Sequence, residues 1–168
     1  MKAIIYTSNT GSTAEYAQLL GNELNLPVHS LQQAKNKVPA GSEIIYLGWI
    51  MAGGIKGYKE AAKLYKVRAV CGVGMGQTGT QLKEVRDKNA IPQRIPLFTL
   101  QGNFDVKKLH GVYRFMMNVM VKTAGKGLAN KTDRTPEEDD MLDMMVNGGK
   151  RVSLQNLKAV TEWYKNIH

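Results

Sequence analysis

The sequence predicts an α/β protein built on one parallel β-sheet with helices on both faces. Short apolar runs typical of buried parallel strands recur through the first hundred or so residues, and segments with helical spacing of apolar residues separate them. This alternation implies right-handed crossovers and a sheet covered on both sides. Because 168 residues suit one well-packed domain, we expect a single domain over residues 1–168.

Five segments are predicted as strands, and three helical segments lie between them. The strands are residues 2–7, 26–31, 43–50, 69–73 and 95–100, of which 26–31 has the weakest pattern. The helices are residues 12–24, 57–65 and 79–88. In the first helix, the apolar face is formed by Ala14, Ala17, Leu19, Leu20 and Leu24.

The C-terminal third departs from this rhythm and predicts a helical insertion over about residues 103–150. Residues 106–131 contain basic side chains and no acid, with apolar residues at helical spacing, which predicts a basic amphipathic helix. The segment Thr135-Pro136-Glu137-Glu138 is typical of a helix start, and that helix is expected to end at Gly148-Gly149. Ser153 is expected to cap the last helix, whose Leu157, Val160 and Trp163 or Tyr164 would pack on the sheet.

Composition narrows the functional classes. Cys71 is the only cysteine and there are three histidines without metal-ligand spacing, so we expect no structural zinc and a buried, non-catalytic thiol. No run reaches the roughly 18 apolar residues of a membrane span. The N-terminal apolar run is too short for a signal peptide, so a cytoplasmic protein is expected. The net charge of +9 favours anionic partners without choosing among them.

The segment between the first strand and the first helix carries most of the chemistry. It reads Ser8-Asn9-Thr10-Gly11-Ser12-Thr13. Free N–H groups and the positive end of a helix dipole make an anion site, the hydroxyls add hydrogen bonds, and Gly11 allows close backbone approach. The loop lacks the Gly-Lys-Ser/Thr of nucleoside triphosphatases. It predicts phosphate binding, and the alternative is a plain turn with a capping hydroxyl.

This segment resembles the phosphate loop of the flavodoxin family, which has the form Ser/Thr-x-Thr-Gly-x-Thr directly after the first strand. The resemblance covers roughly residues 1–102 and the last helix. It implies a doubly wound five-stranded parallel sheet in the order 2-1-3-4-5, with flavin mononucleotide (FMN) bound at the carboxyl edge. In that family the loops after the third and fourth strands enclose the isoalloxazine ring. Here those loops are Trp49-Ile50-Met51-Ala52-Gly53-Gly54 and Gly74-Met75-Gly76-Gln77-Thr78-Gly79.

These two loops leave alternatives open. Trp49 is the natural aromatic neighbour for a flavin, and a core position is the alternative. The loop from Gly74 lacks the tyrosine that flavodoxins often place there. Its Gly-x-Gly-x-x-Gly pattern would suit a dinucleotide, but it follows the fourth predicted strand and lacks the acid expected about 20 residues later.

Two redox functions follow from the resemblance, and no catalytic residue is assigned to either. The first is electron transfer with a partner protein of acidic surface. The second is an FMN-dependent oxidoreductase acting on a quinone or tetrapyrrole-like substrate. For the second, the stretch Tyr113-Arg114-Phe115-Met116 followed by Lys122 resembles the basic insertion of bacterial flavodoxin-like protoporphyrinogen oxidases. It would place a substrate or peripheral membrane contact on residues 106–131, and core packing is the alternative. Nucleic acid binding is disfavoured, because no aromatic-basic module is recognisable.

Overall fold

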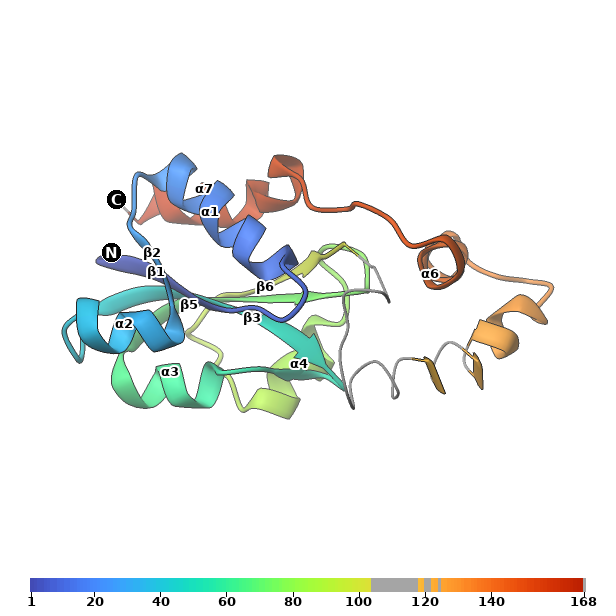
Figure 1. The fold of residues 1–168 in the computed structure, drawn as a ribbon, viewed down its shortest axis with the longest axis horizontal. Coiled ribbons are helices and arrows are strands. Elements are labelled where there is room, and N and C mark those ends of the chain that lie inside the picture. The colour runs from blue at the N-terminus through green and yellow to red at the C-terminus, as the bar shows by residue number, and fades with distance from the viewer. Residues whose placement is uncertain (104–117, 120–121, 124, 168) are drawn as a thin grey trace.

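A parallel sheet forms the centre of the computed structural model, which describes residues 1–103, 118–119, 122–123 and 125–167 (Figure 1). Its parallel strands are β1 (Ala3–Thr7), β2 (Val28–Ser30), β3 (Glu43–Met51), β5 (Lys66–Gly74) and β6 (Leu97–Gln101). They lie in the order β2-β1-β3-β5-β6. Counted along the chain, this is the order 2-1-3-4-5 that the family resemblance implies, so the fold prediction is confirmed. The short β4 (Gly54–Ile55), which pairs antiparallel with the end of β3, was not predicted.

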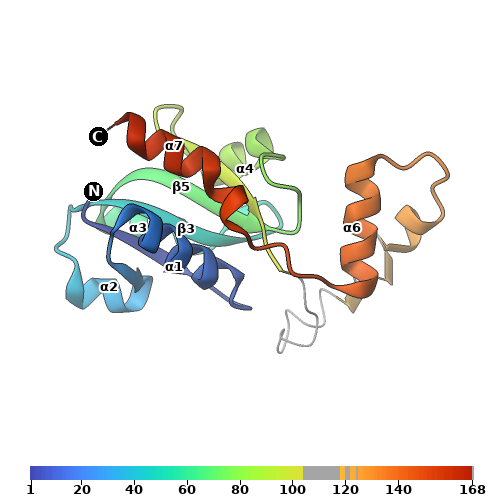
Figure 2. The ribbon, with the colours of Figure 1, turned by 90° about the horizontal axis from the view of Figure 1, so that it is seen from above.

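Helices cover both faces of the sheet, as the crossovers require. One face carries α1 (Ser12–Leu24) and α7 (Lys158–Asn166), and the other carries α2 (Leu31–Lys37), α3 (Tyr58–Leu64) and α4 (Leu82–Asn89) (Figures 1 and 2). Neighbouring strand residues point to opposite faces, so Ile4 packs beneath α1 and α7 while Ile5 packs toward the other three helices. The core is therefore two apolar layers, one on each side of the sheet.

Helix α1 spans the predicted residues 12–24 and lies close to the sheet. Its Tyr16, Ala17 and Leu20 are inaccessible to solvent. Gly21 allows the close approach to β2, because a β-carbon there would lie 2.3 Å from Cγ2 of Val28. Any larger residue at this position would push helix and strand apart.

Two local predictions are corrected. Residues 26–31 were expected as a strand, but β2 covers only 28–30, because a capping box between Ser30 and Gln33 begins the unpredicted helix α2 at once. Ser153 was expected to cap the last helix, and this is wrong, since its side chain makes no capping hydrogen bond. A 3₁₀ turn, η2 (Leu154–Leu157), intervenes and brings Leu157 into the core before α7 begins. The packing of Leu157, Val160, Trp163 and Tyr164 on the sheet is confirmed.

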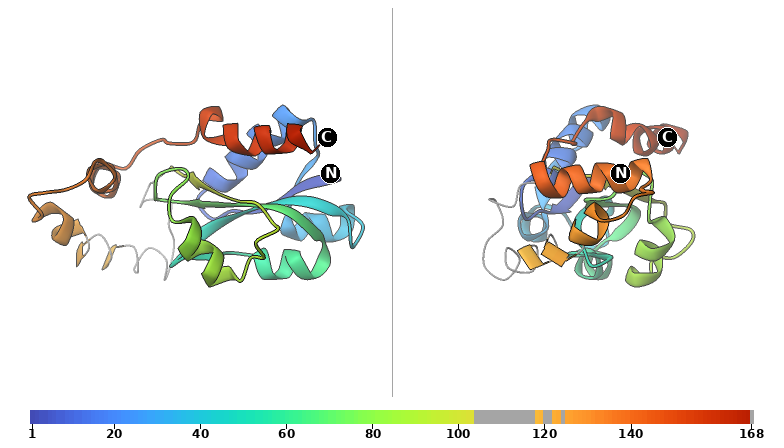
Figure 3. Two further views of the ribbon diagram at one scale, coloured as in Figure 1. Left: turned by 180° about the vertical axis from the view of Figure 1, so that it is seen from behind. Right: turned by 90° about the vertical axis from the view of Figure 1, so that its right-hand side faces the viewer.

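Helix α6 (Pro136–Asn147) lies in the predicted insertion, beyond the carboxyl ends of the strands (Figures 1 and 3). Its predicted start is confirmed, with the capping box between Thr135 and Glu138 formed and the C-cap at Gly148. Of the basic helix predicted over 106–131, residues 106–117, 120–121 and 124 lie outside the described residues, while 118–119, 122–123 and 125–129 are helical. No helix in the described part of the chain has the length and apolar character to cross a membrane.

The burial of Cys71 offers a way to measure how tightly the core is packed. It lies in β5, wholly buried, and burial raises the pKa of its thiol from 9.0 to about 12, as expected for a buried, unreactive cysteine. We expect a thiol reagent at neutral pH to label Cys71 no faster than the protein unfolds, with the guanidinium-unfolded chain as the fast control. Because the folded pKa is the higher one, burial of the neutral thiol stabilises the fold fully below pH 9.0, and this contribution is lost as the pH rises toward 12. Rapid labelling of the native protein would contradict this picture.

Candidate functional site

The carboxyl ends of the central strands bring three segments to one edge of the sheet. The strand register aligns Thr7, Gly48, Gly72 and Thr99 across β1, β3, β5 and β6. The chain beyond each of these positions therefore opens at the same edge (Figure 1). Open α/β sheets bind their ligands in the crevice outside this edge.

The segment from Ser8 to Gly11 leads directly into α1 and leaves its amide groups unpaired. Gly11 is the N-cap, with a φ of 106° that only glycine adopts readily. No side chain caps the helix, and within the described residues no hydrogen bond uses the N–H groups of residues 9–13. The first helical bond runs from the N–H of Glu15 to the carbonyl of Gly11, at 2.9 Å. A row of donors and the positive end of the helix dipole are thus left for a ligand.

The hydroxyl of Ser8 adds an independent sign of a ligand. Its Oγ is shielded from solvent and has no hydrogen-bond partner, the single such side-chain atom in the part of the chain that the structure describes. A buried polar group without a partner costs about 1–3 kcal/mol. A phosphate oxygen beside Ser8 would accept a hydrogen bond from this hydroxyl and remove that cost.

Ser12 uses its hydroxyl for a contact within the protein. Its Oγ accepts a hydrogen bond from the N–H of Asn103 at 3.0 Å, so the hydroxyl is directed to the end of β6. Asn103 also donates to the carboxylate of Glu15 at 3.0 Å. Its Oδ1 accepts from the N–H groups of Arg151, at 2.6 Å, and Val152, at 3.0 Å. Asn103 therefore joins the start of α1 to both ends of the insertion.

The predicted ring loop after the third strand is mostly a β-hairpin. Strand β3 continues to Met51, and Ile50 pairs with Ile55 of β4. Ala52 and Gly53, with φ of 46° and 75°, form the turn, as a two-residue hairpin requires. The hairpin holds Trp49, Ile50 and Met51 in a fixed extended backbone at the edge of the site.

A lysine that the sequence did not single out lies beside Trp49. The ammonium of Lys56 is 5.7 Å from the centre of the Trp49 ring, within the range of a cation–π contact. The carbonyl of Lys56 accepts from the hydroxyl of Tyr46 at 2.7 Å, and that hydroxyl is also 2.8 Å from Oγ1 of Thr7. Burial raises the pKa of Tyr46, so its hydroxyl stays protonated and available to donate. These contacts connect the hairpin to Thr7, the residue just before the Ser8–Gly11 segment.

The buried side-chain amide of Asn89 holds the hairpin in place from α4. Nδ2 of Asn89, at the end of α4, donates to the carbonyls of Gly53 and Val85 at 2.8 and 2.7 Å. Its Oδ1 accepts from the N–H of Ile55 at 2.8 Å. The amide is therefore fully used in fixing both sides of the turn to the helix.

The loop after β5 is fastened to β6, yet its centre keeps free donors. The N–H of Gly79 donates to the carbonyl of Thr99 at 3.0 Å, and that of Gly102 donates to the carbonyl of Gly74 at 2.7 Å. No hydrogen bond among the described residues uses the N–H groups of Gly76 or Gln77. Two backbone donors are thus held at the site edge on a fixed loop.

Gln101 extends the site edge to the insertion. Its Nε2 lies 2.5 Å from Oδ2 of Asp140 and 3.3 Å from the sulfur of Met144, both on α6. The same Nε2 lies 3.4 Å from the carbonyl of Met75 in the loop after β5. Arg151 further holds Asp140 at 3.2 Å. In this way α6 is attached at the edge where the Ser8–Gly11 segment, the hairpin and the loop after β5 meet.

The polar groups described at this edge are mainly backbone N–H groups, hydroxyls and side-chain amides. No group of three His, Cys, Asp or Glu side chains that could hold a metal occurs among the described residues. Sequence reasoning missed Lys56, Asn89, Gln101 and Asn103, because single polar residues without a motif give no signal until distant segments meet. All predicted contact residues, from Ser8–Thr13, Trp49–Gly53 and Gly74–Gln77, do lie on the three segments at this edge.

One comparison with known proteins identifies a relationship. A family model described as a flavodoxin domain matches residues 3–131. The match covers well over half of the chain and includes every strand of the sheet. A search of curated proteins finds no match to the chain.

The amide of Asn89 provides a test of how the hairpin is held. We expect Asn89→Ala to lower the free energy of unfolding by about 2–3 kcal/mol, because it leaves the buried N–H of Ile55 without its acceptor and removes the hydrogen bonds to the carbonyls of Gly53 and Val85. Urea unfolding followed by circular dichroism measures this change. Asn36→Ala on the exposed surface of α2 is the matched control and should change stability by less than about 0.5 kcal/mol. Equal midpoints for the two variants would contradict the assigned role.

Proposed function

The chain belongs to the flavodoxin family, and we propose that it binds FMN and exchanges electrons with a partner protein. Flavodoxin-like domains in general bind a flavin. The observation that carries the proposal is the buried, unpaired hydroxyl of Ser8 beside the unpaired amides of residues 9–13. Donors without partners at the start of a helix suit a phosphate group, and FMN is the flavin that ends in one.

The phosphate would be held without a lysine in the loop. The donors are the N–H groups of residues 9–13 and the hydroxyls of Ser8 and Thr10, with the positive end of α1 behind them. The hydroxyl of Ser12 would not contact the phosphate itself. It would keep Asn103 and the start of the helix in place. Hydrogen bonds from fixed donors to a charged oxygen are stronger than those between neutral groups.

The ring system would lie between the hairpin and the loop after β5. The hairpin offers the indole of Trp49 with the cation of Lys56 beside it. The loop offers the N–H groups of Gly76 and Gln77, which suit polar atoms at the edge of a flavin. Bound FMN supplies one- or two-electron transfer, and the chain's part is to bind it, orient it and set the local charge.

The partner we propose is a redox protein with an acidic surface. The net charge of +9 would steer such a partner toward this chain and make association sensitive to salt. Nucleic acid would meet the same charge, but the chain offers no recognisable module for it.

A second function is favoured by the attachment of the insertion to the site. Through Gln101, helix α6 is tied to the same edge as the phosphate loop. Residues of the insertion would then border a substrate placed beside the flavin. On this basis the alternative is an FMN-dependent oxidoreductase acting on a quinone or tetrapyrrole-like substrate, with residues 106–131 as a substrate or peripheral membrane contact.

Ser8 gives a test in which stability and binding move in opposite directions. We expect Ser8→Ala to raise the Kd for FMN about tenfold, because a hydrogen bond to a charged group is lost. In ligand-free protein the same change removes an unpaired buried hydroxyl, so the free energy of unfolding should stay equal or rise. FMN fluorescence quenching measures the first effect and urea unfolding the second. Ser153→Ala, at an exposed serine that makes no capping bond, is the control for both.

Gly11→Ala should abolish tight binding, since alanine is strained at a φ of 106°. An FMN affinity equal to wild type in both Ser8→Ala and Gly11→Ala would sink the phosphate-loop assignment.

The two redox functions differ in what the FMN-loaded protein turns over. For the carrier, we expect a flavodoxin reductase to reduce the bound flavin, at a rate that falls as salt is added, with no steady-state turnover of small molecules. For the enzyme, we expect turnover of a quinone or tetrapyrrole by stopped-flow and steady-state absorbance. Turnover that persists without any partner protein would replace the carrier by the enzyme.

A further inference from the structure

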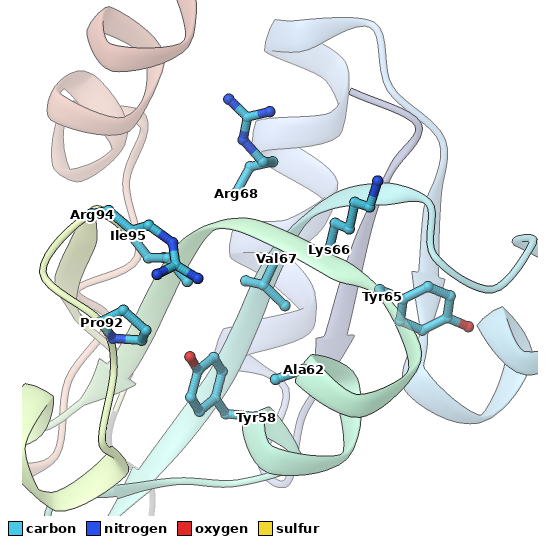
Figure 4. Close-up of a pocket in the computed structure, with 9 residues that line it drawn as sticks. All are labelled: Tyr58, Ala62, Tyr65, Lys66, Val67, Arg68, Pro92, Arg94 and Ile95. Atoms are coloured by element: carbon cyan, nitrogen blue, oxygen red, sulfur yellow. The ribbon is translucent and has the colours of Figure 1, made fainter.

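A cleft lies at the edge of the sheet opposite the candidate flavin site (Figure 4). It has a volume of about 570 Å³ and is bounded by α3, the first residues of β5 and the segment that leads into β6. Since β5 begins at Lys66 and ends at Gly74, this is the amino edge, whereas the phosphate loop opens at the carboxyl edge. The volume is within the range of small-molecule sites, about 300–1,000 Å³.

The charged side chains that line the cleft are all positive. Lys66, Arg68 and Arg94 line it, and no acidic side chain does. Arg68 is held by Glu43, with Nη1 and Oε1 2.7 Å apart. Neither Lys66 nor Arg94 enters a salt bridge within the described part of the chain. Two positive charges therefore remain uncompensated at this cleft.

Arg94 is carried by a segment with a fixed backbone. Nη1 of Arg86 donates to the carbonyls of Ile91, Pro92 and Ile95, at 3.3, 2.8 and 3.1 Å. These bonds hold the backbone on both sides of Arg94, so its side chain projects from a defined position of the chain. A preorganised cation loses less conformational entropy on binding a ligand than one on a mobile loop.

The hydroxyl of Tyr58 faces the same space. The ring is buried against Tyr46, with centres 6.4 Å apart, and in Figure 4 the hydroxyl and the guanidinium of Arg94 point toward one another. Burial raises the pKa of Tyr58, while the guanidinium groups of Arg86 and Arg94 oppose this rise. The phenol thus remains a protonated donor next to a cation. Ala62, Val67, Pro92 and Ile95 add apolar surface to the wall, and Tyr65 completes it.

We propose that this cleft binds a small organic anion with a planar apolar body and one phosphate or carboxylate group. The anionic group would meet the fork of Arg94 and the hydroxyl of Tyr58, because a guanidinium pairs with both kinds of oxyanion through two parallel hydrogen bonds. The ammonium group of Lys66 would add electrostatic attraction for the anionic group. The planar body would lie on Val67 and Ile95.

The proposal goes beyond the redox function and does not depend on it. A ligand at the amino edge would not touch a flavin at the carboxyl edge. The test is therefore made on FMN-saturated protein, in which the phosphate loop is filled. Should the protein take up no FMN, the same titrations are made on Gly11→Ala, whose phosphate loop is disabled.

The probes are adenosine 5′-monophosphate and 1-naphthoate, titrated by isothermal calorimetry. They carry a phosphate and a carboxylate respectively, so the pair shows which anionic group the cleft takes. We expect at least one to bind and Arg94→Gln to weaken it about tenfold or more, as expected for loss of a bidentate ionic contact. Lys165→Gln, which removes the same charge from α7 on the other face of the sheet, should bind like wild type.

Two results would overturn the proposal. One is that neither probe binds the wild-type protein. The other is that a probe binds but Arg94→Gln leaves its Kd unchanged, which would move the binding elsewhere. Circular dichroism of both variants checks that the exposed substitutions leave the fold intact, and Tyr58→Phe, which keeps the ring, gives a second variant that should weaken the same probe.

Discussion

Burial of both faces of the parallel sheet is the constraint on which the rest of this structure depends. Each parallel strand must be joined to the next by a connection whose helix covers one face and which returns the chain to the amino edge of the sheet. Consequently all strand-to-helix loops open at the carboxyl edge and all helix-to-strand segments open at the amino edge. The two layers of core residues, typified by Ile4 and Ile5, are what holds this arrangement together.

The loops at the carboxyl edge owe their positions to three buried or half-buried amide side chains. Asn89 fixes the hairpin from α4, Gln101 fixes the loop after β5 and reaches α6, and Asn103 joins α1 to the insertion. Each amide satisfies backbone groups that the irregular segments leave unpaired. A site that is assembled from loops is thereby held in a fixed position relative to the sheet behind it. The unpaired donors that remain, above all at Ser8, are those that a ligand would use.

The two edges of the sheet would meet an anion with different kinds of group. At the carboxyl edge the groups are neutral: amide N–H groups, hydroxyls and the helix dipole, which surround a group closely at short range. At the amino edge they are the full charges of Lys66 and Arg94 in an open cleft. The buried Tyr46 and Tyr58, in ring contact, lie between these two regions beneath the sheet.

The sequence by itself determined the fold class, implied the strand order through its family resemblance, and predicted phosphate binding at Ser8–Thr13. Apolar runs and helical spacing are local patterns, and Ser8–Thr13 is a continuous motif, so one reading along the chain finds them. It misread residues 26–31, where a three-residue strand passes straight into a helix, and it overlooked the hairpin at Ala52-Gly53. Only the tertiary structure decided that Ser12 serves Asn103, that Lys56 lies beside Trp49, and that Arg94 meets Tyr58 in a cleft. These contacts join residues whose separation along the chain carries no pattern, because the packing of helices on a twisted sheet, and not local periodicity, sets which side chains meet.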